Sequence, residues 1–288
     1  MGVPTPIQQS WSVTCTTRSF HPMAFTATAE ATHLHVEDHV SANDAAAAAD
    51  VVEVFEDVDL EATLDHLACS EREANLTSST CTATFTVTNN GPADDVITDT
   101  DVTFAGEDGC LITPTGTQTT VITLGTGESQ TVTTDVTITC PTAGRHVVRV
   151  VGDVHNSVTD PHAVDSDTVN GIWVPADVKP RSYPSSVNLD KKGVLPFAIL
   201  GTADFNPLTA VNNDSLTFGV DGDEDSVLRC AAEGEDVNGD GYLDLICLAD
   251  TALTEVACTT THLEIRGTLL DGTPLFSQDE VHVTGCRS

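Results

Sequence analysis

A two-residue alternation of apolar and polar side chains recurs along most of this chain, and it constrains the fold more than any other feature. The segment CTATFTVTNNGP, residues 81–92, places Ala83, Phe85 and Val87 on one face and threonines on the other. The segment TVTTDVTITC, residues 131–140, alternates in the same way. Successive side chains of a β-strand point to opposite faces of the sheet, so these segments predict half-buried strands. Because helical periodicity is nearly absent and turn residues recur between the strands, we predict an all-β fold of tandem antiparallel β-sandwich domains.

The charge of the chain argues against several classes of partner. The 288 residues carry 44 Asp and Glu against 11 Lys and Arg, which gives a formal net charge of −33. Binding to nucleic acid or to an anionic membrane surface needs clustered Lys and Arg, so neither partner is expected. No apolar run approaches the ~18 residues of a membrane-spanning helix, so we expect no membrane insertion. Such an acidic surface suits high salt or a calcium-rich exterior, or it serves solubility alone.

Nine cysteines indicate an oxidising compartment outside the cell. They lack the close Cys-x-x-Cys pairs of zinc and redox sites, so disulfides are the better interpretation. Eight of the cysteines fall into two groups of four, and each group can form two disulfides in three alternative pairings. The first group is Cys69, Cys81, Cys110 and Cys140, and the second is Cys230, Cys247, Cys258 and Cys286. Cys15 is left over.

An internal repeat offers an explanation for the ninth cysteine. The segment 12–45 resembles the segment 137–167, and Cys15 matches Cys140. On this interpretation residues 1–52 are the C-terminal strands of a truncated preceding domain, whose missing part holds the partner of Cys15. The alternative is an irregular leader with a free thiol.

The beginning of the chain, MGVPTPIQQSW, has no basic region followed by an apolar run, so it predicts no signal peptide. Either the protein is not exported, or this chain is a fragment of a longer one; the repeat favours the fragment. The alanine-rich run 43–50 is predicted to be a loop between strands, or else a short helical turn, because alanine favours helix.

The middle region, about residues 53–173, resembles the Ig-like conserved-repeat domains of bacterial and archaeal surface proteins. The resemblance rests on TATFTVTNNGP at 82–92, on the late strand 132–140, and on NSVTDPHAVDSDT at 156–168. It implies an Ig-like sandwich that serves as a spacer or an adhesive module. A domain boundary is expected at Trp-Val-Pro-Ala-Asp, residues 173–177, after which the composition changes.

The acidic segment DVNGDGYLD has the spacing of a calcium-binding loop. Oxygen-bearing side chains stand at its positions 1, 3, 5 and 9, which are Asp236, Asn238, Asp240 and Asp244. Calcium takes six to eight oxygen ligands, and alternate side chains of a tight loop converge on one point. Gly241 permits the sharp turn, and the carbonyl of Tyr242 would supply a further ligand. We therefore predict a Ca2+ site at these five residues.

This loop departs from an EF-hand, because Cys247 stands where a bidentate glutamate belongs. Its flanks, VLRCAAE and LDLICLA, are strand-like, so we place the loop at the tip of a β-hairpin. It resembles the integrin-type calcium loop D-x-N-x-D-G-x-x-D of secreted β proteins. Glu233 and Glu235 could add ligands, and Cys230 and Cys247 could clamp the hairpin base. The alternative is an acidic turn that binds no ion.

Residues 178–286 resemble a domain found at the ends of secreted multidomain bacterial and archaeal proteins. The resemblance rests on DVKPRSYPSSVN, GVLPFAILGTADFNP, LRCAAEGEDVNGDGYLDLIC and GTLLDGTPL. It implies a calcium-binding, β-sandwich-like domain without an established catalytic role. A second acidic cluster stands in an inserted DGDED stretch at Asp221, Asp223, Glu224 and Asp225. Because it lacks the Asx-x-Asp-Gly pattern, a solvated loop is the favoured interpretation, and a second metal site is the alternative that the sequence cannot decide.

No catalytic motif was found, so we predict a protein that is not an enzyme. His33, His35 and His39 could gather a transition metal, although a dedicated site is the weaker interpretation. The predicted function is that of a non-catalytic, calcium-binding, modular protein outside the cell or on its surface, with a structural or adhesive role and an unknown protein or glycan partner. The alternative is a carbohydrate-binding accessory region of a secreted hydrolase. That function needs exposed aromatic side chains, and the Trp and Tyr residues are limited to Trp11, Trp173, Tyr183 and Tyr242.

Overall fold

The structure is a computed structural model of the whole chain. It describes residues 8, 10–12, 19–28, 45–54, 58–70, 77–107, 109–142, 146–156, 165–182, 184–190 and 193–286. The chain divides into two compact units: residues 1–57 with 160–163, and residues 58–159 with 164–288. Each is described by itself.

The first unit contains a two-stranded antiparallel hairpin of β1 (Ser19–Thr28) and β2 (Ala45–Val54). The prediction of a loop or helical turn at 43–50 is therefore wrong from residue 45 onward. Ten residues of β2 pair with ten of β1, and this pairing outweighs the helical preference of alanine. The repeat residues Cys15, His33, His35 and His39 lie outside the described residues, so the repeat and the histidine cluster stay predictions.

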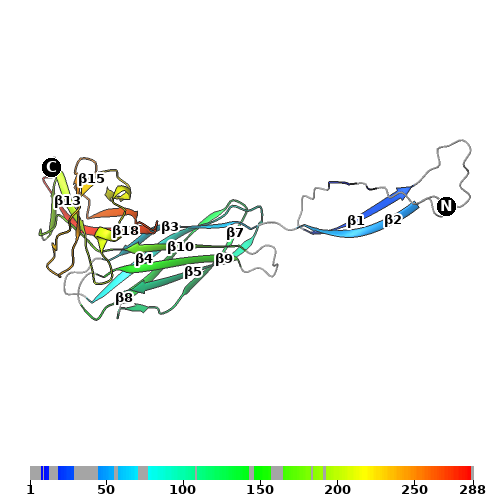
Figure 1. Ribbon diagram of the computed structural model, residues 1–288, viewed down its shortest axis with the longest axis horizontal. Coiled ribbons are helices and arrows are strands. Elements are labelled where there is room, and N and C mark those ends of the chain that lie inside the picture. The colour runs from blue at the N-terminus through cyan, green and yellow to red at the C-terminus, as the bar shows by residue number, and fades with distance from the viewer. Residues whose placement is uncertain are drawn as a thin grey trace, which may run out of the picture. The chain divides into compact units, whose positions relative to one another are not determined.

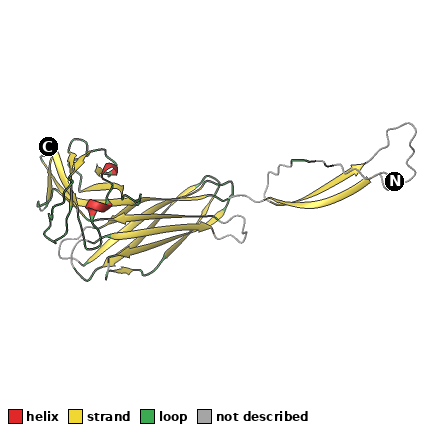
Figure 2. Ribbon diagram, viewed as in Figure 1, coloured by secondary structure: helices red, strands yellow, loops and turns green. Residues whose placement is uncertain are grey.

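The second unit begins with an Ig-like sandwich of two sheets (Figures 1 and 2). One sheet has the order β3-β4-β8-β6, from Leu60–Cys69, Ser78–Asn89, Ser129–Thr139 and Leu111–Thr113. The facing sheet has the order β10-β9-β5-β7, from Ser166–Trp173, Val148–Asn156, Val96–Gly106 and Gln118–Leu124. These antiparallel strands confirm the all-β prediction.

The apolar residues of the alternating segments form the core of this sandwich. On β4, Ala83, Phe85 and Val87 are each at most 1% exposed, whereas the intervening threonines are half-buried. The strand ends at Asn89, whose side chain bonds the turn that follows. Its Nδ2 donates to the carbonyl of Ala93 at 2.7 Å, and its Oδ1 accepts from the amide of Gly91 at 3.1 Å. Asn-Gly-Pro therefore breaks the strand as its turn chemistry predicts.

The C-terminal part packs two layers of strands around its own core. One layer has the order β11-β13-β16-β15, from Ala176–Val178, Val194–Ile199, Leu245–Asp250 and Val227–Cys230. The other contains β12 (Ser185–Asn188), β14 (Thr217–Gly219), β17 (His262–Thr268) and β18 (Pro274–Thr284). Two short helices, α1 (Pro207–Ala210) and η2 (Asn213–Ser215), lie between β13 and β14.

The two parts of this unit share a sheet. Strand β10 pairs in parallel with β18, so the order β14-β17-β18-β10-β9-β5-β7 runs from the C-terminal part into the Ig-like part. The hydrophobic cores also interlock: Phe276 of β18 joins the Ig-like core, and Ile172 of β10 joins the C-terminal core. The segment 173–177, where we expected a boundary, is thus a change of sheet within one compact unit. The division into domains stays a prediction.

Four disulfides form within the two cysteine groups, as the sequence predicted. They are Cys69–Cys81, Cys110–Cys140, Cys230–Cys247 and Cys258–Cys286. The third joins facing residues of β15 and β16, which confirms the expected clamp at the base of the acidic hairpin.

Candidate metal centre

The loop 236–244 lies between two antiparallel strands, β15 and β16, as the flanking sequence predicted. Two features hold its ends together. The Cys230–Cys247 disulfide joins the strands, and a β-bridge between Glu235 and Asp244 closes the neck through a 3.2 Å and a 3.1 Å backbone hydrogen bond. The residues between these two points must therefore turn within a short span.

Asp236 organises the first half of the turn. Its Oδ1 accepts hydrogen bonds from the amides of Gly239 at 2.7 Å and Asp240 at 3.2 Å. Its Oδ2 accepts from the amide of Gly241 at 3.0 Å. Three backbone N–H groups thus point at one carboxylate, which fixes the curvature of the loop. Gly239 and Gly241 both have positive φ, at 82° and 94°, a conformation that glycine adopts without strain.

Asn238 and Asp240 face each other across the turn. The amide of Asp240 donates to Asn238 Oδ1 at 3.0 Å, and Asn238 Nδ2 donates to Asp240 Oδ2 at 2.8 Å. The amide of Tyr242 donates to Asp240 Oδ1 at 2.9 Å. The loop therefore brings the oxygens of its first three predicted ligands into one hydrogen-bonded network. The ring of Tyr242 is 43% exposed, so this residue would contribute its backbone carbonyl alone.

Asp244 lies at the base of the loop and is fully buried. Its Oδ1 accepts from the amide of Gly201, and its Oδ2 accepts from the amide of Val237, both at 2.8 Å. Burial raises the pKa of this carboxyl above its usual 3.8, the two amide hydrogen bonds oppose the shift, and the charges of Asp240 and Asp236 add to it. A cation bound at the loop would favour the ionised form and reverse this trend.

The predicted ligands do not all converge in this conformation. Among the described residues, Asp236, Asp240 and Asp244 do not form a group of three carboxylates with oxygens within 4.8 Å of one another. Glu235, considered as an extra ligand, forms an ion pair with Arg181 instead. Carboxylate and amide oxygens are ligands that calcium takes, but a shared ion would require the side chains of Asp236 and Asp240 to move toward that of Asp244.

The second acidic cluster does converge. Asp221, Asp223 and Glu224 place carboxylate oxygens within 4.8 Å of one another, and Asp225 is not part of this group. Asp221 and Asp223 are exposed, whereas Glu224 is buried. Sequence reasoning included these residues but favoured a solvated loop over a metal site, because they lack the Asx-x-Asp-Gly pattern that identifies the first loop.

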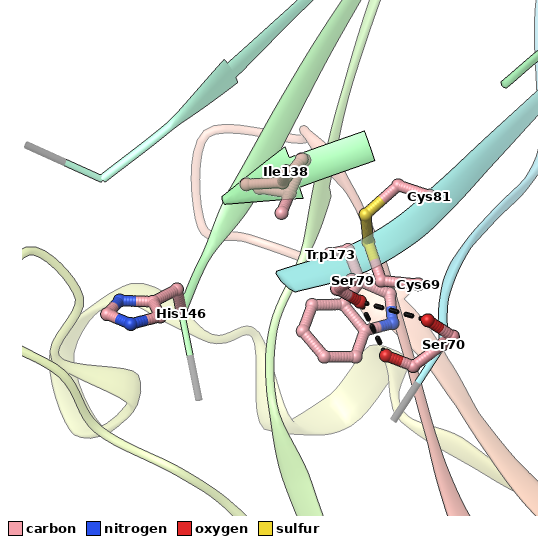
Figure 3. A pocket seen from close by; sticks show the side chains of 8 residues that line it. Cys69, Ser70, Ser79, Cys81, Ile138, His146 and Trp173 are labelled. Carbon is pink, nitrogen blue, oxygen red and sulfur yellow. Dashed lines mark hydrogen bonds between the residues drawn. A yellow bond between two sulfur atoms is a disulfide. The ribbon is translucent and has the colours of Figure 1, made fainter. Parts of the chain in front are cut away.

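A small pocket lies in the Ig-like part, and none of the residues that line it belongs to either acidic loop (Figure 3). Its walls include the Cys69–Cys81 disulfide, Trp173 and His146, and its volume of about 20 Å³ holds one or two water molecules. Ser79 donates to the carbonyl of Ser70 at 2.5 Å, and His146 Nδ1 lies 2.7 Å from Glu107 Oε2. Both polar groups are engaged in structural contacts, and the pocket is too small for a substrate.

Gly201, which contacts the first loop, was not among the residues that the sequence predicted for the site. Gly201 donates its amide to Asp244, and a Cβ placed there would lie 2.5 Å from the carbonyl oxygen of Leu243. It belongs to the segment GVLPFAILGTADFNP, which the sequence associated with the domain but not with the loop. A contact between residues 43 positions apart leaves no local signal that could have revealed it.

Comparisons with known proteins find a family match in the middle of the chain. Residues 58–182 match the model of the CARDB family. Among solved structures, the crystal structure of the CupB6 tip adhesin from Pseudomonas aeruginosa aligns at 7% identity, over 80% of this chain and 99% of that chain, with a TM-score of 0.22. No curated protein matches the chain. Across the residues that the structure describes, no helix has the length and apolar character needed to span a membrane.

Proposed function

We propose that this chain is a non-catalytic, calcium-binding part of an extracellular or cell-surface protein, with a structural or adhesive role. The observation that carries the proposal is the loop 236–244, where three backbone amides hold Asp236 and a disulfide clamps the supporting hairpin. The CARDB match of residues 58–182 fits a cell-surface adhesive role. The four disulfides fit an oxidising exterior.

Calcium would stabilise the folded state by neutralising the carboxylates of this loop. Asp236, Asp240 and Asp244 bring three formal negative charges to one short loop of a protein whose net charge is already −33. A divalent cation offsets most of the local charge and compensates the cost of ionising the buried Asp244. Because the unfolded loop holds no such site, calcium at 100 times its Kd would add about 2.7 kcal/mol to the free energy of unfolding.

Thermal unfolding tests the proposal. We expect the melting temperature of the whole chain to rise when calcium replaces EDTA at matched ionic strength. Asp240→Ala should lose the part of this rise that comes from the loop 236–244, because it removes a ligand and the acceptor for the Tyr242 amide. Asp204→Ala, which removes an exposed carboxylate of the same domain, should keep it. Equal calcium responses in the wild type and Asp240→Ala would exclude this loop as the site.

One observation favours the second candidate function, carbohydrate binding. In the first unit, the ring centroids of Trp11 and Phe25 are 5.2 Å apart, and both side chains are exposed, at 65% and 38%. Adjacent exposed rings are the surface that a sugar ring stacks on. Trp173 cannot serve this function because it is 7% exposed, and Tyr183 lies outside the described residues. A pull-down with insoluble polysaccharides, repeated with Trp11→Ala, would show binding that depends on this pair, or none.

A further inference from the structure

Glu224 lies in the acidic stretch between β14 and β15, and its surroundings fix its position. Its carbonyl accepts hydrogen bonds from the amides of Phe218 at 3.0 Å and Ser226 at 2.8 Å. Its carboxylate packs on the backbone of Gly219, where an added Cβ would lie 2.2 Å from Glu224 Cδ. The residue is 9% exposed, so its carboxylate is held inside the fold and cannot turn freely toward solvent.

One oxygen of this carboxylate has no hydrogen-bond partner. Oε1 accepts from the amide of Asp221 at 2.9 Å, whereas Oε2 is buried without a donor. A buried acceptor without a partner costs about 1–3 kcal/mol, and more when the group is charged. Such groups are rare in folded proteins and call for an explanation, of which a bound ion is one.

Two further carboxylates converge on the same point. Oxygens of Asp221, Asp223 and Glu224 all lie within 4.8 Å of one another. Among the described residues, no lysine, arginine or histidine forms an ion pair with any of the three. Arg266 packs near the stretch, because a Cβ on Gly222 would lie 3.0 Å from its Nε, but its ion pair is with Glu264 at 2.9 Å. Three like charges at this spacing repel each other strongly when one of them is buried.

We propose that Asp221, Asp223 and Glu224 form a second calcium site, distinct from the loop 236–244. Calcium–oxygen distances of about 2.3–2.6 Å allow two oxygens on one ion to lie about 5 Å apart, so the observed spacing fits a shared ion. Calcium suits the site because it accepts irregular arrangements of carboxylate oxygens and completes its shell with water at the exposed side. The buried Glu224 oxygen then has a partner, and the ion neutralises two of the three charges.

Calcium titration calorimetry of the whole chain tests this proposal and separates it from the first site. We expect two calcium ions per wild-type chain. Glu224→Gln, which keeps the shape of the side chain and removes its charge, should lose one ion. Asp240→Ala should lose the other, and the double variant should lose both. Asp225→Asn is the matched control, because it removes one charge from the same stretch at a residue outside the converging group.

The outcomes are distinguishable. If Glu224→Gln binds as many ions as the wild type, the second site is wrong, whatever happens at Asp240. If Glu224→Gln loses an ion while Asp240→Ala loses none, the second site stands and the proposed site in the loop 236–244 fails. Asp223→Asn provides a variant at an exposed position that should fold normally and also lose one ion. In EDTA, Glu224→Gln should melt no lower than the wild type, because it removes an uncompensated buried charge.

Discussion

Residues 236–244 and residues 221–225 are two acidic loops of the same domain whose carboxylates are arranged differently. In the first loop, Asp236 accepts three hydrogen bonds from the amides of its own turn, and Asp244 accepts two. In the second, Glu224 keeps a buried oxygen without a partner, and the carboxylates converge on one another. The first loop stabilises its own charges through backbone amides, whereas in the second loop the proposed cation would serve this purpose.

This difference shows which properties of a loop can be recognised from a sequence motif. The spacing D-x-N-x-D-G-x-x-D specifies how a loop turns and which amides meet which oxygens, so it can be recognised in one sequence. The second loop has no such pattern, because its site depends on how Glu224 packs against β14. A recognisable motif and an electrostatic need for an ion are therefore separate properties, and the following predictions separate them.

The largest expected effect comes from opening the disulfide clamp. Replacing Cys230 and Cys247 by serine removes a cross-link between residues 17 positions apart, which costs about 3 kcal/mol of unfolding free energy. The variant should also bind calcium more weakly at the loop 236–244 and keep the ion at Glu224. Replacing Cys258 and Cys286 by serine is the control, and it should destabilise the chain without weakening calcium binding at the first loop. Denaturant unfolding and calorimetry measure both effects, and equal calcium affinities in the two double variants would contradict the account.

A smaller effect is expected from adding one methyl group at Gly219 of β14, which contacts Glu224, or at Gly241 of the first loop. Gly219→Ala should cost about 1–3 kcal/mol and eliminate the second calcium ion, because the new Cβ displaces the Glu224 carboxylate. Gly241→Ala meets open space, so its cost of about 1–2 kcal/mol comes from the positive φ alone. Calcium stoichiometry distinguishes them. A Gly219→Ala protein that still binds two ions would show that Glu224 does not hold one.

Much of the fold could be predicted from the sequence, because its signals are local. The alternation around Phe85 predicted β4, the Asn-Gly-Pro turn predicted where it ends, and the strand-like flanks placed the loop 236–244 at a hairpin tip. The facing positions of Cys230 and Cys247 followed from the same hairpin. The five predicted calcium ligands stay a prediction.

The remaining features depend on long-range packing. The parallel pairing of Trp173 with Phe276 joins strands about 100 residues apart, and the sequence of neither strand indicates which strand it pairs with. Ala45 to Asp50 form a strand because β1 pairs with them, although alanine by itself favours helix. The burial of Glu224 depends on Gly219 across a turn, so its exposed neighbours in sequence made it look like a solvated residue.

A pH titration sharpens the comparison at Asp244. Its pKa is raised by burial in the calcium-free chain, so the folded state holds this proton to higher pH than the unfolded state. The resulting stability cost is absent below the unfolded pKa of 3.8, grows as pH rises through the interval up to the raised value, and is complete above it. The melting temperature of the calcium-free wild type should therefore fall more steeply across this interval than that of Asp244→Asn. Parallel curves would mean that Asp244 carries no such cost.

The smallest effect is expected at Tyr242. Its ring is 43% exposed, and its predicted contribution is a backbone carbonyl that any residue provides. Tyr242→Ala should therefore leave both stability and calcium affinity within about 0.5 kcal/mol of the wild type. A large loss of affinity on calorimetry would show that the ring helps to form the site. A loss of polysaccharide binding without a loss of calcium would instead favour the carbohydrate alternative.

The central claim is that the loop 236–244 binds calcium through the oxygens of its five predicted ligands. Anomalous X-ray diffraction from crystals grown with calcium tests it most directly. We expect an anomalous peak between the side chains of Asp236, Asn238, Asp240 and Asp244 and the carbonyl of Tyr242, with oxygens at about 2.3–2.6 Å. A map without a peak there, in which Asp236 still accepts only the amides of its own turn, would contradict it.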